Sequence, residues 1–414
     1  MLHPALILQF LTATTLAFAT PVNTNTLFTK RTNHLTKRAT CIPTSAGSAS
    51  TDDVPAIKAA ITSCGSSGII QIPSGETYQI RSVLDFSGCS NCDFQIEGTL
   101  KVSDDTSFWN GKSAVITLSG ITGAKIRSVT GSGLLDGNGQ KSWDKFAGDS
   151  SFDRPTLVVV GGGSKGVSVS NLRVKNAPNV FFSITGNSAN TALTSLTLTA
   201  VSSSSNLPKN TDGFDVGPAS YTTFKNITVS NNDDCIAFKP GANYCTVDTI
   251  TCKGSHGISV GSLGKKAGST DTVQNIYVKN ADMQTSTKAV GIKLYPGGSK
   301  HGTAVVRNVT FDGITVSSSD YAAQIQSCYN EDASYCASNP STAQVTDIYF
   351  KNFKGAVSAK YAPTVANINC PSAGTCNVNF SGWSVTTPKG SPKYLCANID
   401  NADPGLSCSS GASG

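Results

Sequence analysis

One short phrase recurs along this chain: an Asn or Asp followed by alternating apolar residues. Copies of it begin at Asn171, Asn226, Asp248, Asn275, Asn308 and Asp347. From Asn226 onward, successive copies are 22, 27, 33 and 39 residues apart. A period in the twenties that grows by loop insertion is typical of a solenoid, in which each repeat is one coil stacked on the previous coil.

The phrase itself indicates strands, because its residues alternate and many are β-branched. No helical pattern separates the copies, so we expect an all-β, right-handed parallel β-helix rather than βαβ units. A β-sandwich is the alternative, but it would not repeat one phrase in coil after coil. One capping helix is predicted over 54–63, where Val54, Ile57, Ala60 and Ile61 share a face and Asp52 or Asp53 could cap the N-terminus.

The first residues are predicted to be a targeting segment. Residues 5–19 form an apolar and small-residue run that ends in Ala17-Phe18-Ala19, a small-x-small cleavage signal, and the run is too short to span a membrane. We therefore expect a signal peptide over 1–19 and secretion to the extracellular space. A pro-segment is expected over 20–38, ending in the dibasic pair Lys37-Arg38, with a single mature domain over 39–414.

The charge balance argues against two classes of partner. The chain has 32 Lys+Arg and 26 Asp+Glu, and residues 1–38 hold four of the basic residues and no acidic one. The remainder is therefore close to neutral, which gives no case for binding nucleic acid or a membrane. It keeps only the histidines His256 and His301, too few for a multi-histidine zinc site.

Thirteen cysteines, all at or beyond Cys41, indicate disulfides in a secreted chain. Proximity in sequence suggests six pairs and leaves Cys245 buried and free, although spacing alone does not prove connectivity. The suggested pairs are Cys41–Cys64, Cys89–Cys92, Cys235–Cys252, Cys328–Cys336, Cys370–Cys376 and Cys396–Cys408. Sequons at Asn226, Asn308 and Asn379 fit surface glycosylation.

Acidic residues are sparse, but several gather at the spacing of one coil. Asp212 lies 21 residues before Asp233, His256 lies 22 residues after Asp234, and Lys293 follows 37 residues after His256. Residues one coil apart in a β-helix lie above each other, so we expect these five side chains on one face. Glycoside hydrolysis needs one protonated carboxyl group to donate to the leaving oxygen and one carboxylate to activate water or attack the anomeric carbon. Crowding three carboxylates raises the pKa of at least one, and a lysine beside them can bind an acidic sugar.

The same residues also fit two roles without catalysis. Asp-Asp and Asn-Thr-Asp sequences occur in Asx turns and solvated edges, although four motifs in order at coil spacing make this purely structural role the weaker interpretation. Asp212, Asp233, Asp234 and His256 could instead hold a cation. Because one histidine is present and no dense oxygen-ligand loop of EF-hand type is found, we predict no metal site.

The ordered motifs resemble the signature of glycoside hydrolase family 28, the polygalacturonase-like enzymes with a pectin-lyase-like β-helix. They are Asn210-Thr211-Asp212, Asp233-Asp234, Ser255-His256-Gly257 and Ile292-Lys293, preceded by Gly131–Gly139 and Trp143. The likeness extends from about Cys41 to Cys408. It implies an inverting hydrolase of α-1,4 galacturonosyl linkages without a cofactor. By that resemblance Asp233 is the general acid, Asp212 and Asp234 activate water, His256 supports the acid, and Lys293, Tyr329 and Asn210 bind substrate.

One departure from the family pattern bears on the substrate. Polygalacturonases normally have Arg-Ile-Lys where this chain has Gly291-Ile292-Lys293. Loss of a bidentate carboxylate ligand should weaken binding of plain polygalacturonate and open a volume that a decorated galacturonan could use. The segments 291–298 and 324–329 resemble the xylogalacturonan hydrolases of the family, which cut between xylose-bearing galacturonates. The segments 238–240 and 255–264 also resemble exopolygalacturonases, so exo action on polygalacturonate is the second hypothesis.

Two unlike functions remain as alternatives: a calcium-dependent pectate lyase, which also uses a β-helix, and a non-catalytic wall-binding solenoid. Trp143 follows a Gly-Asn-Gly sequence and is predicted to contact sugar, with packing as a nearly equal alternative. The expected partner is a pectic polysaccharide, and the protein is expected to be a monomer.

Overall fold

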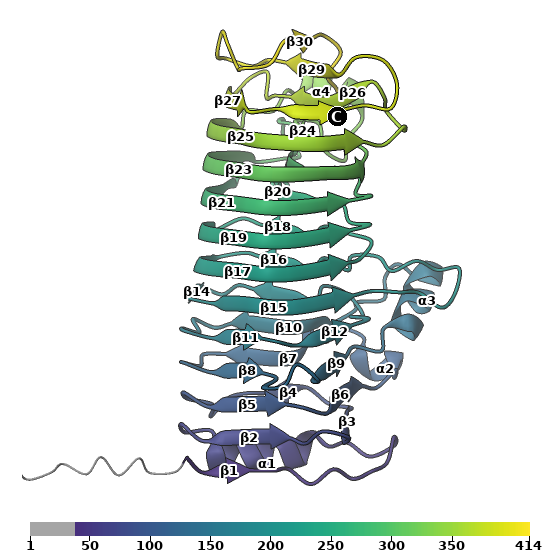
Figure 1. Cartoon of the computed structure of the whole chain (residues 1–414), viewed down its shortest axis with the longest axis vertical. Helices are drawn as coiled ribbons and strands as arrows, with labels where there is room; N and C mark the ends of the chain where they lie inside the picture. Colours follow the sequence, from purple (N-terminus) through teal and green to yellow (C-terminus); the bar gives the residue numbers. More distant parts are fainter. Residues whose placement is uncertain (1–37) are drawn as a thin grey trace, which may run out of the picture. The chain divides into compact units, whose positions relative to one another are not determined.

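The computed structural model describes residues 38–414, which form one unit (Figure 1). The predicted signal peptide and all of the predicted pro-segment except Arg38 lie outside the described residues. The described unit consists mainly of two long sheets, and every strand pairing in both of them is parallel. The second sheet takes one strand from each coil, whereas the first takes two short strands from each N-terminal coil and one long strand from the later coils. Successive coils stack with their backbones hydrogen-bonded.

The first sheet has 18 strands. They are β1 (Thr40–Cys41), β2 (Ile69–Ile72), β3 (Thr77–Ile80), β5 (Asp93–Ile96), β6 (Thr99–Val102), β8 (Lys125–Arg127), β9 (Leu134–Asp136), β11 (Ser168–Ser170), β12 (Arg173–Lys175), β14 (Ser188–Ala189), β15 (Ala192–Thr199), β17 (Ala219–Ser230), β19 (Ala242–Lys253), β21 (Thr270–Gln284), β23 (Thr303–Ser319), β25 (Gln344–Val357), β27 (Thr375–Ser381) and β28 (Ser384–Thr386).

The second sheet has 12 strands and carries the candidate site. They are β4 (Leu84–Asp85), β7 (Ala114–Ser119), β10 (Thr156–Gly161), β13 (Phe182–Ile184), β16 (Phe214–Val216), β18 (Ile236–Phe238), β20 (Ile258–Leu263), β22 (Val290–Leu294), β24 (Ala323–Gln326), β26 (Thr364–Asn369), β29 (Lys393–Ala397) and β30 (Cys408–Ser409).

The core fills the space between the sheets with like residues stacked coil on coil. Phe311, Phe350 and Phe380 form one such column, with ring centroids 5.5 Å and 4.9 Å apart. This packing follows from the parallel register, which sets Phe311 opposite Phe350 and Phe350 opposite Phe380. The predicted parallel β-helix is confirmed.

The copies of the recurring Asn or Asp phrase do not all occupy the same position in the coil. Asn275, Asn308 and Asp347 lie above each other at one bend, whereas Asn171 and Asn226 belong to a second bend further along the coil. All five have a positive φ of 52° to 58°, the left-handed conformation that Asn and Asp adopt more readily than other non-glycine residues. The sixth copy differs, because Thr249 and not Asp248 takes this conformation there, with a φ of 64°. The sequence pattern therefore merged two columns that share one backbone requirement.

Four helices interrupt the coils: α1 (Val54–Cys64), α2 (Thr106–Trp109), α3 (Gln140–Gly148) and α4 (Ala333–Ser338). The predicted capping helix is confirmed as α1. Of the two candidate caps, Asp52 accepts from the Val54 N–H at 3.3 Å, whereas the Asp53 carboxylate accepts from Ala46 and Gln79 outside the helix. The other helices were not predicted, and α3 stands beside the candidate site.

All six predicted disulfides are present, and Cys245 is buried and unpaired in the described part of the chain. Each bond links residues 3 to 23 positions apart, so the disulfides fasten local loops and coil ends. Over residues 38–414, none of the helices has the length and apolar character needed to cross a bilayer.

Candidate active site

The site is built where three neighbouring strands of the second sheet begin. Phe214, Ile236 and Ile258 are in register across β16, β18 and β20. Two residues before each of them stand Asp212, Asp234 and His256, which therefore form one row across three coils. Asp233 precedes Asp234 at the edge of this row. The sequence spacing thus placed these four side chains on neighbouring coils of one face, as the structure has them.

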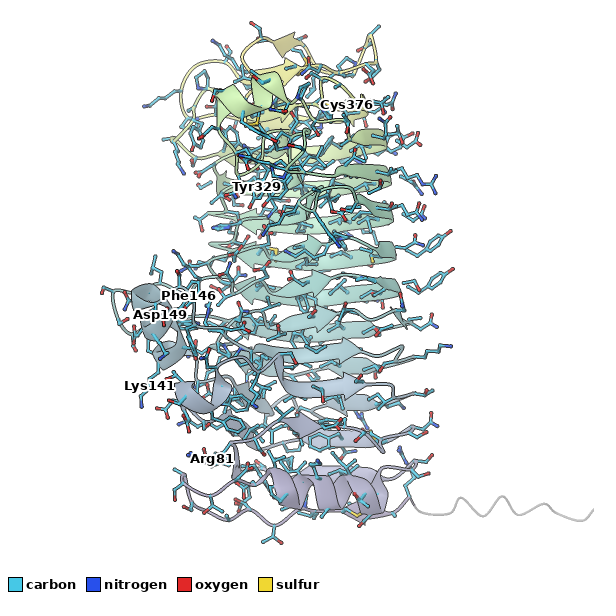
Figure 2. The ribbon with its side chains drawn as sticks, turned by 180° about the vertical axis from the view of Figure 1, so that it is seen from behind. Arg81, Lys141, Phe146, Asp149, Tyr329 and Cys376 are labelled. Atoms are coloured by element: carbon cyan, nitrogen blue, oxygen red, sulfur yellow. A yellow bond between two sulfur atoms is a disulfide. The ribbon has the colours of Figure 1, made fainter. Side chains whose placement is uncertain are left out.

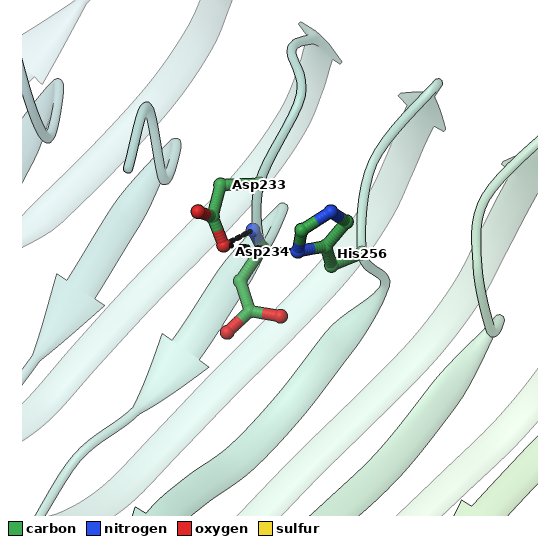
Figure 3. A group of neighbouring side chains, drawn as sticks. All are labelled: Asp233, Asp234 and His256. Carbon is green, nitrogen blue, oxygen red and sulfur yellow. Dashed lines mark hydrogen bonds and ion pairs between the residues drawn. The ribbon is translucent and has the colours of Figure 1, made fainter. Parts of the chain in front are cut away.

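Asp233 and His256 face each other at the solvent side of the row (Figure 3). Nδ1 of His256 lies 3.2 Å from Oδ1 of Asp233, and the His256 side chain is 46% exposed. The carboxylate also accepts the N–H groups of Asn210, at 3.1 Å, and Asp234, at 2.8 Å. Burial is the largest single influence and raises the pKa of Asp233, but the hydrogen bond from His256, the charge of His256 and the Asp234 N–H together outweigh it, so the pKa lies below its usual range.

Asp234 lies deeper and forms a buried ion pair with Lys293. Lys293 Nζ is 2.5 Å from Asp234 Oδ2, and the hydroxyl of Ser259 donates to the other oxygen at 2.8 Å. Burial opposes the charge of Asp234, but Lys293 and then Lys288 overcome it and hold its pKa at about 2. This carboxylate is therefore ionised at any pH well above 2.

Asp212 shares its surroundings with Asp215 and Lys239. Lys239 Nζ lies 3.6 Å from Asp212 and 3.4 Å from Asp215. Burial, followed by the charges of Asp215 and Asp233, raises the pKa of Asp212 well above its usual range. One carboxyl of the cluster does have a raised pKa, as expected, but in this structure it is Asp212 rather than Asp233.

The raised pKa of Asp212 makes a prediction about stability. A buried carboxyl with a raised pKa destabilises the fold as pH rises through that pKa, because its ionised form is more favourable in the unfolded chain. Asp212→Asn is therefore expected to raise Tm at pH 7, and the gain should shrink toward pH 3, where the aspartate is neutral in both states. Tm measured from pH 3 to pH 7 tests this.

Asp248 offers a control of opposite sign for that experiment. Hydrogen bonding by Asn280 lowers the pKa of its partly exposed carboxyl, so Asp248→Asn should bring no gain in Tm at pH 7. An Asp212→Asn protein that is no more stable than the wild type at pH 7 would contradict the conclusion that burial penalises the charge of Asp212.

Arg154 was missed in the sequence because no motif surrounds it. It is 5% exposed, and its guanidinium donates to the carbonyl of Lys209 at 2.7 Å and the side chain of Asn210 at 2.9 Å. The same group lies 3.7 Å from the ring centroid of Phe146 in α3. Since the Asn210 N–H donates to Asp233, Arg154 fixes the segment that orients this carboxylate. Asn210 thus holds Asp233 in place, a role that the resemblance did not imply.

The structure contradicts the open volume expected at Gly291 and supports the packing alternative for Trp143. A Cβ at Gly291 would come within 2.7 Å of Cδ and 2.8 Å of Cε of Lys288, and within 2.6 Å of the Gln324 carbonyl oxygen. The predicted open volume at Gly291 is therefore wrong, because the stem of Lys288 fills it. Trp143 is 1% exposed and donates to the Ala177 carbonyl at 3.1 Å, so it packs in the interior instead of contacting sugar.

A groove of about 700 Å³ runs over this row, between α3 and the C-terminal coils (Figure 2). Phe146 lines it at one end and Tyr329 at the other, where Lys293 Nζ lies 5.4 Å from the tyrosine ring centroid. Its charged lining contains both carboxylates and cations: Asp153, Arg154, Asp212, Asp215, Asp233, Asp234, Lys239, His256 and Lys293. Such a groove can bind a polyanion and present carboxyl groups to it.

The geometry of the cluster also bears on whether it could hold a cation. One donor atom each from Asp233, Asp234 and His256 lie within 4.8 Å of one another. However, Asp234 is already paired with Lys293, and Lys288 and Lys239 also stabilise its charge. A divalent ion would face these ammonium groups in a buried setting, so the donor set does not fit a metal.

Comparisons with known proteins agree with this geometry. The family model described as "Glycosyl hydrolases family 28" matches residues 64–408. The "Probable endo-xylogalacturonan hydrolase A" of Aspergillus oryzae is 58% identical over 377 residues, covering 91% of this chain and 92% of that protein. The "Endo-xylogalacturonan hydrolase A" of Aspergillus tubingensis is 55% identical with the same coverage.

Solved structures place the fold in the same group. The crystal structure of endo-xylogalacturonan hydrolase from Aspergillus tubingensis has a TM-score of 0.89 and 55% identity, over 91% of this chain and 100% of that chain. The polygalacturonase from Erwinia carotovora is 18% identical with a TM-score of 0.66, over 88% and 96% of the chains, and supports the fold alone. This chain therefore belongs to glycosyl hydrolases family 28.

Proposed function

We propose that this chain hydrolyses α-1,4 galacturonosyl linkages within xylose-substituted galacturonan. The observation that carries the proposal is the row of Asp212, Asp233, Asp234 and His256 in a groove whose cations suit a polyuronate. Relatives that are 55% to 58% identical bear the name endo-xylogalacturonan hydrolase, which supports the substrate. Because pectic polysaccharides are extracellular, we also propose that the protein is secreted.

In this proposal Asp233 donates a proton to the leaving glycosidic oxygen. Asp212 and Asp234 hold a water molecule that attacks the anomeric carbon from the opposite face, and the configuration inverts. The proton released by the water passes to the carboxylate pair. Lys293 would bind a uronate carboxylate, since its ammonium group lines the groove beside Tyr329.

The lowered pKa of Asp233 in the free protein must be reconciled with a proton donor. A bound galacturonan brings negative charges beside Asp233, and like charges raise the pKa of a carboxyl group. His256 lies 3.2 Å from Asp233 and can hold the carboxyl group in position through a hydrogen bond. Binding of the anionic substrate would thus favour the protonated form of the group that must donate the proton.

Product analysis tests the proposed substrate. The purified protein is expected to release xylose-bearing oligogalacturonides from xylogalacturonan, with unchanged activity in the presence of a chelator and no ultraviolet absorbance from unsaturated ends. Unsubstituted polygalacturonate is the comparison. Release of single galacturonates from that polymer, with little action on xylogalacturonan, would instead identify an exopolygalacturonase, and chelator-sensitive, absorbing products would identify a pectate lyase.

A further inference from the structure

A second recess of about 590 Å³ lies beside the groove and shares its catalytic edge. Asp233 and His256 line both spaces, as do Phe146 and Asn210. The recess extends from this edge toward the bends that precede the second sheet, where Thr285 and Thr287 stand exposed. A sugar unit bound at Asp233 could therefore have one substituent in the recess while its polymer chain lies in the groove.

The two spaces differ in the ligands that they suit. The groove carries Arg154, Lys239 and Lys293, whereas the recess includes none of these three. Apart from His256, Lys209 is the one cation among the described residues that line the recess, and its side chain is exposed. A uronate carboxylate binds most favourably beside buried cations, so the recess is poorly suited to a charged sugar.

The recess instead combines apolar surface with hydroxyl groups. Leu207 is 67% exposed and stands with Phe146 and Pro208 on one side, and the hydroxyls of Thr285 and Thr287 stand on the other. A neutral sugar has C–H faces that pack against apolar side chains and hydroxyls that exchange hydrogen bonds with threonine. Small-ligand sites are commonly lined in this way, with much apolar surface and a few polar groups.

The wall formed by Leu207 is held in place by α3. Asp144 accepts hydrogen bonds from the hydroxyl of Ser204 at 2.6 Å and the amide of Asn206 at 2.9 Å. On the same helix, Phe146 packs against the guanidinium of Arg154. An exposed leucine on a fastened loop offers apolar contact area at little entropic cost on binding.

We propose that this recess is the subsite for the neutral sugar branch of the substrate. The inference rests on the proposed function and names the place of the branch in it. It replaces the space expected at Gly291, which Lys288 occupies. A xylose unit on the galacturonate next to Asp233 would lie against Leu207 and Phe146, and its hydroxyls would reach Thr285 and Thr287.

Filling the recess tests the proposal. In Thr287→Phe, the ratio of kcat/KM on xylogalacturonan to kcat/KM on unsubstituted galacturonan is expected to fall at least about tenfold, the usual scale for a filled sugar or side-chain pocket. Thr223→Phe, an exposed threonine in β17 of the other sheet, is the matched control and should leave the ratio unchanged. An unchanged ratio in Thr287→Phe would overturn the proposal, whether both rates fall together or neither falls.

A binding measurement separates this inference from the proposed function. With Asp233→Asn as background, calorimetry compares a xylose-bearing oligogalacturonide with the same oligomer after enzymatic removal of xylose. Tighter binding of the branched oligomer, by a margin that Thr287→Phe abolishes, supports the recess. Equal binding of both oligomers overturns it. A wild-type protein that does not cut xylogalacturonan would contradict the proposed function, and the calorimetric comparison would still decide the recess.

Discussion

Asp233→Asn is expected to lower kcat on xylogalacturonan by about 10³-fold, within the usual range for loss of a general acid. Asparagine has nearly the same shape and can keep the hydrogen bond from the Asn210 N–H, but it cannot donate a proton to the leaving oxygen. The side chain is only partly buried and makes no ion pair other than that with His256 among the described residues. Tm should therefore stay close to that of the wild type, and KM should change little.

Asp212→Asn is the informative comparison for that variant. Both substitutions should lower kcat strongly if Asp233 donates the proton and Asp212 helps to hold the water. The two differ in stability, because only Asp212 has a raised pKa that penalises its charge at pH 7. If Asp233→Asn retained wild-type kcat while Asp212→Asn did not cleave, Asp212 would be the acid and the assignment of Asp233 would be wrong.

The coil spacing could predict the catalytic row because residues that are one coil apart in the sequence of a β-helix lie next to each other in space. Asp234 and His256 are 22 residues apart, which is one coil, and the structure has them side by side. Lys293 shows the limit of this reasoning. Its strand partner is Gly261, not His256, and it reaches Asp234 only because a lysine side chain is long. Spacing fixes which coils are adjacent, whereas side-chain reach decides which groups meet.

Several features of the site could not be predicted because they depend on side-chain paths between segments. Nothing in the sequence indicates that Lys288 lies across Gly291, or that its ammonium group donates to the His256 carbonyl at 2.7 Å. Arg154 reaches Asn210 from 56 residues away, and no local pattern marks that contact. The exposed recess behind Asp233 requires the placement of α3, a helix that the repeat pattern gave no reason to expect.

Lys293→Met is expected to destabilise the protein by about 3–5 kcal/mol and to abolish cleavage, because it leaves the charge of Asp234 buried without its partner. The two side chains are 8% and 1% exposed. The double variant Asp234→Asn/Lys293→Met removes both charges and should recover most of the lost stability while remaining inactive. Urea unfolding at pH 7 gives the free energies of unfolding of the wild type, Lys293→Met and the double variant.

The partly exposed pair Lys279–Asp248 supplies the control for this cycle. Lys279 Nζ lies 3.2 Å from Asp248 Oδ2, and the two side chains are 39% and 27% exposed. Lys279→Met should therefore lower the free energy of unfolding by no more than about 1 kcal/mol.

The pH dependence of stability gives a further check on the Lys293–Asp234 pair. The wild-type pair keeps its contribution above the unfolded pKa of aspartate, near 4, and loses it as pH falls through about 2. In Lys293→Met, Asp234 can take up a proton at a higher pH than in the wild type. The difference in free energy of unfolding between this variant and the wild type should therefore shrink as pH falls from 7 to 3. A double variant as unstable as Lys293→Met would show that Lys293 stabilises the fold through contacts other than Asp234.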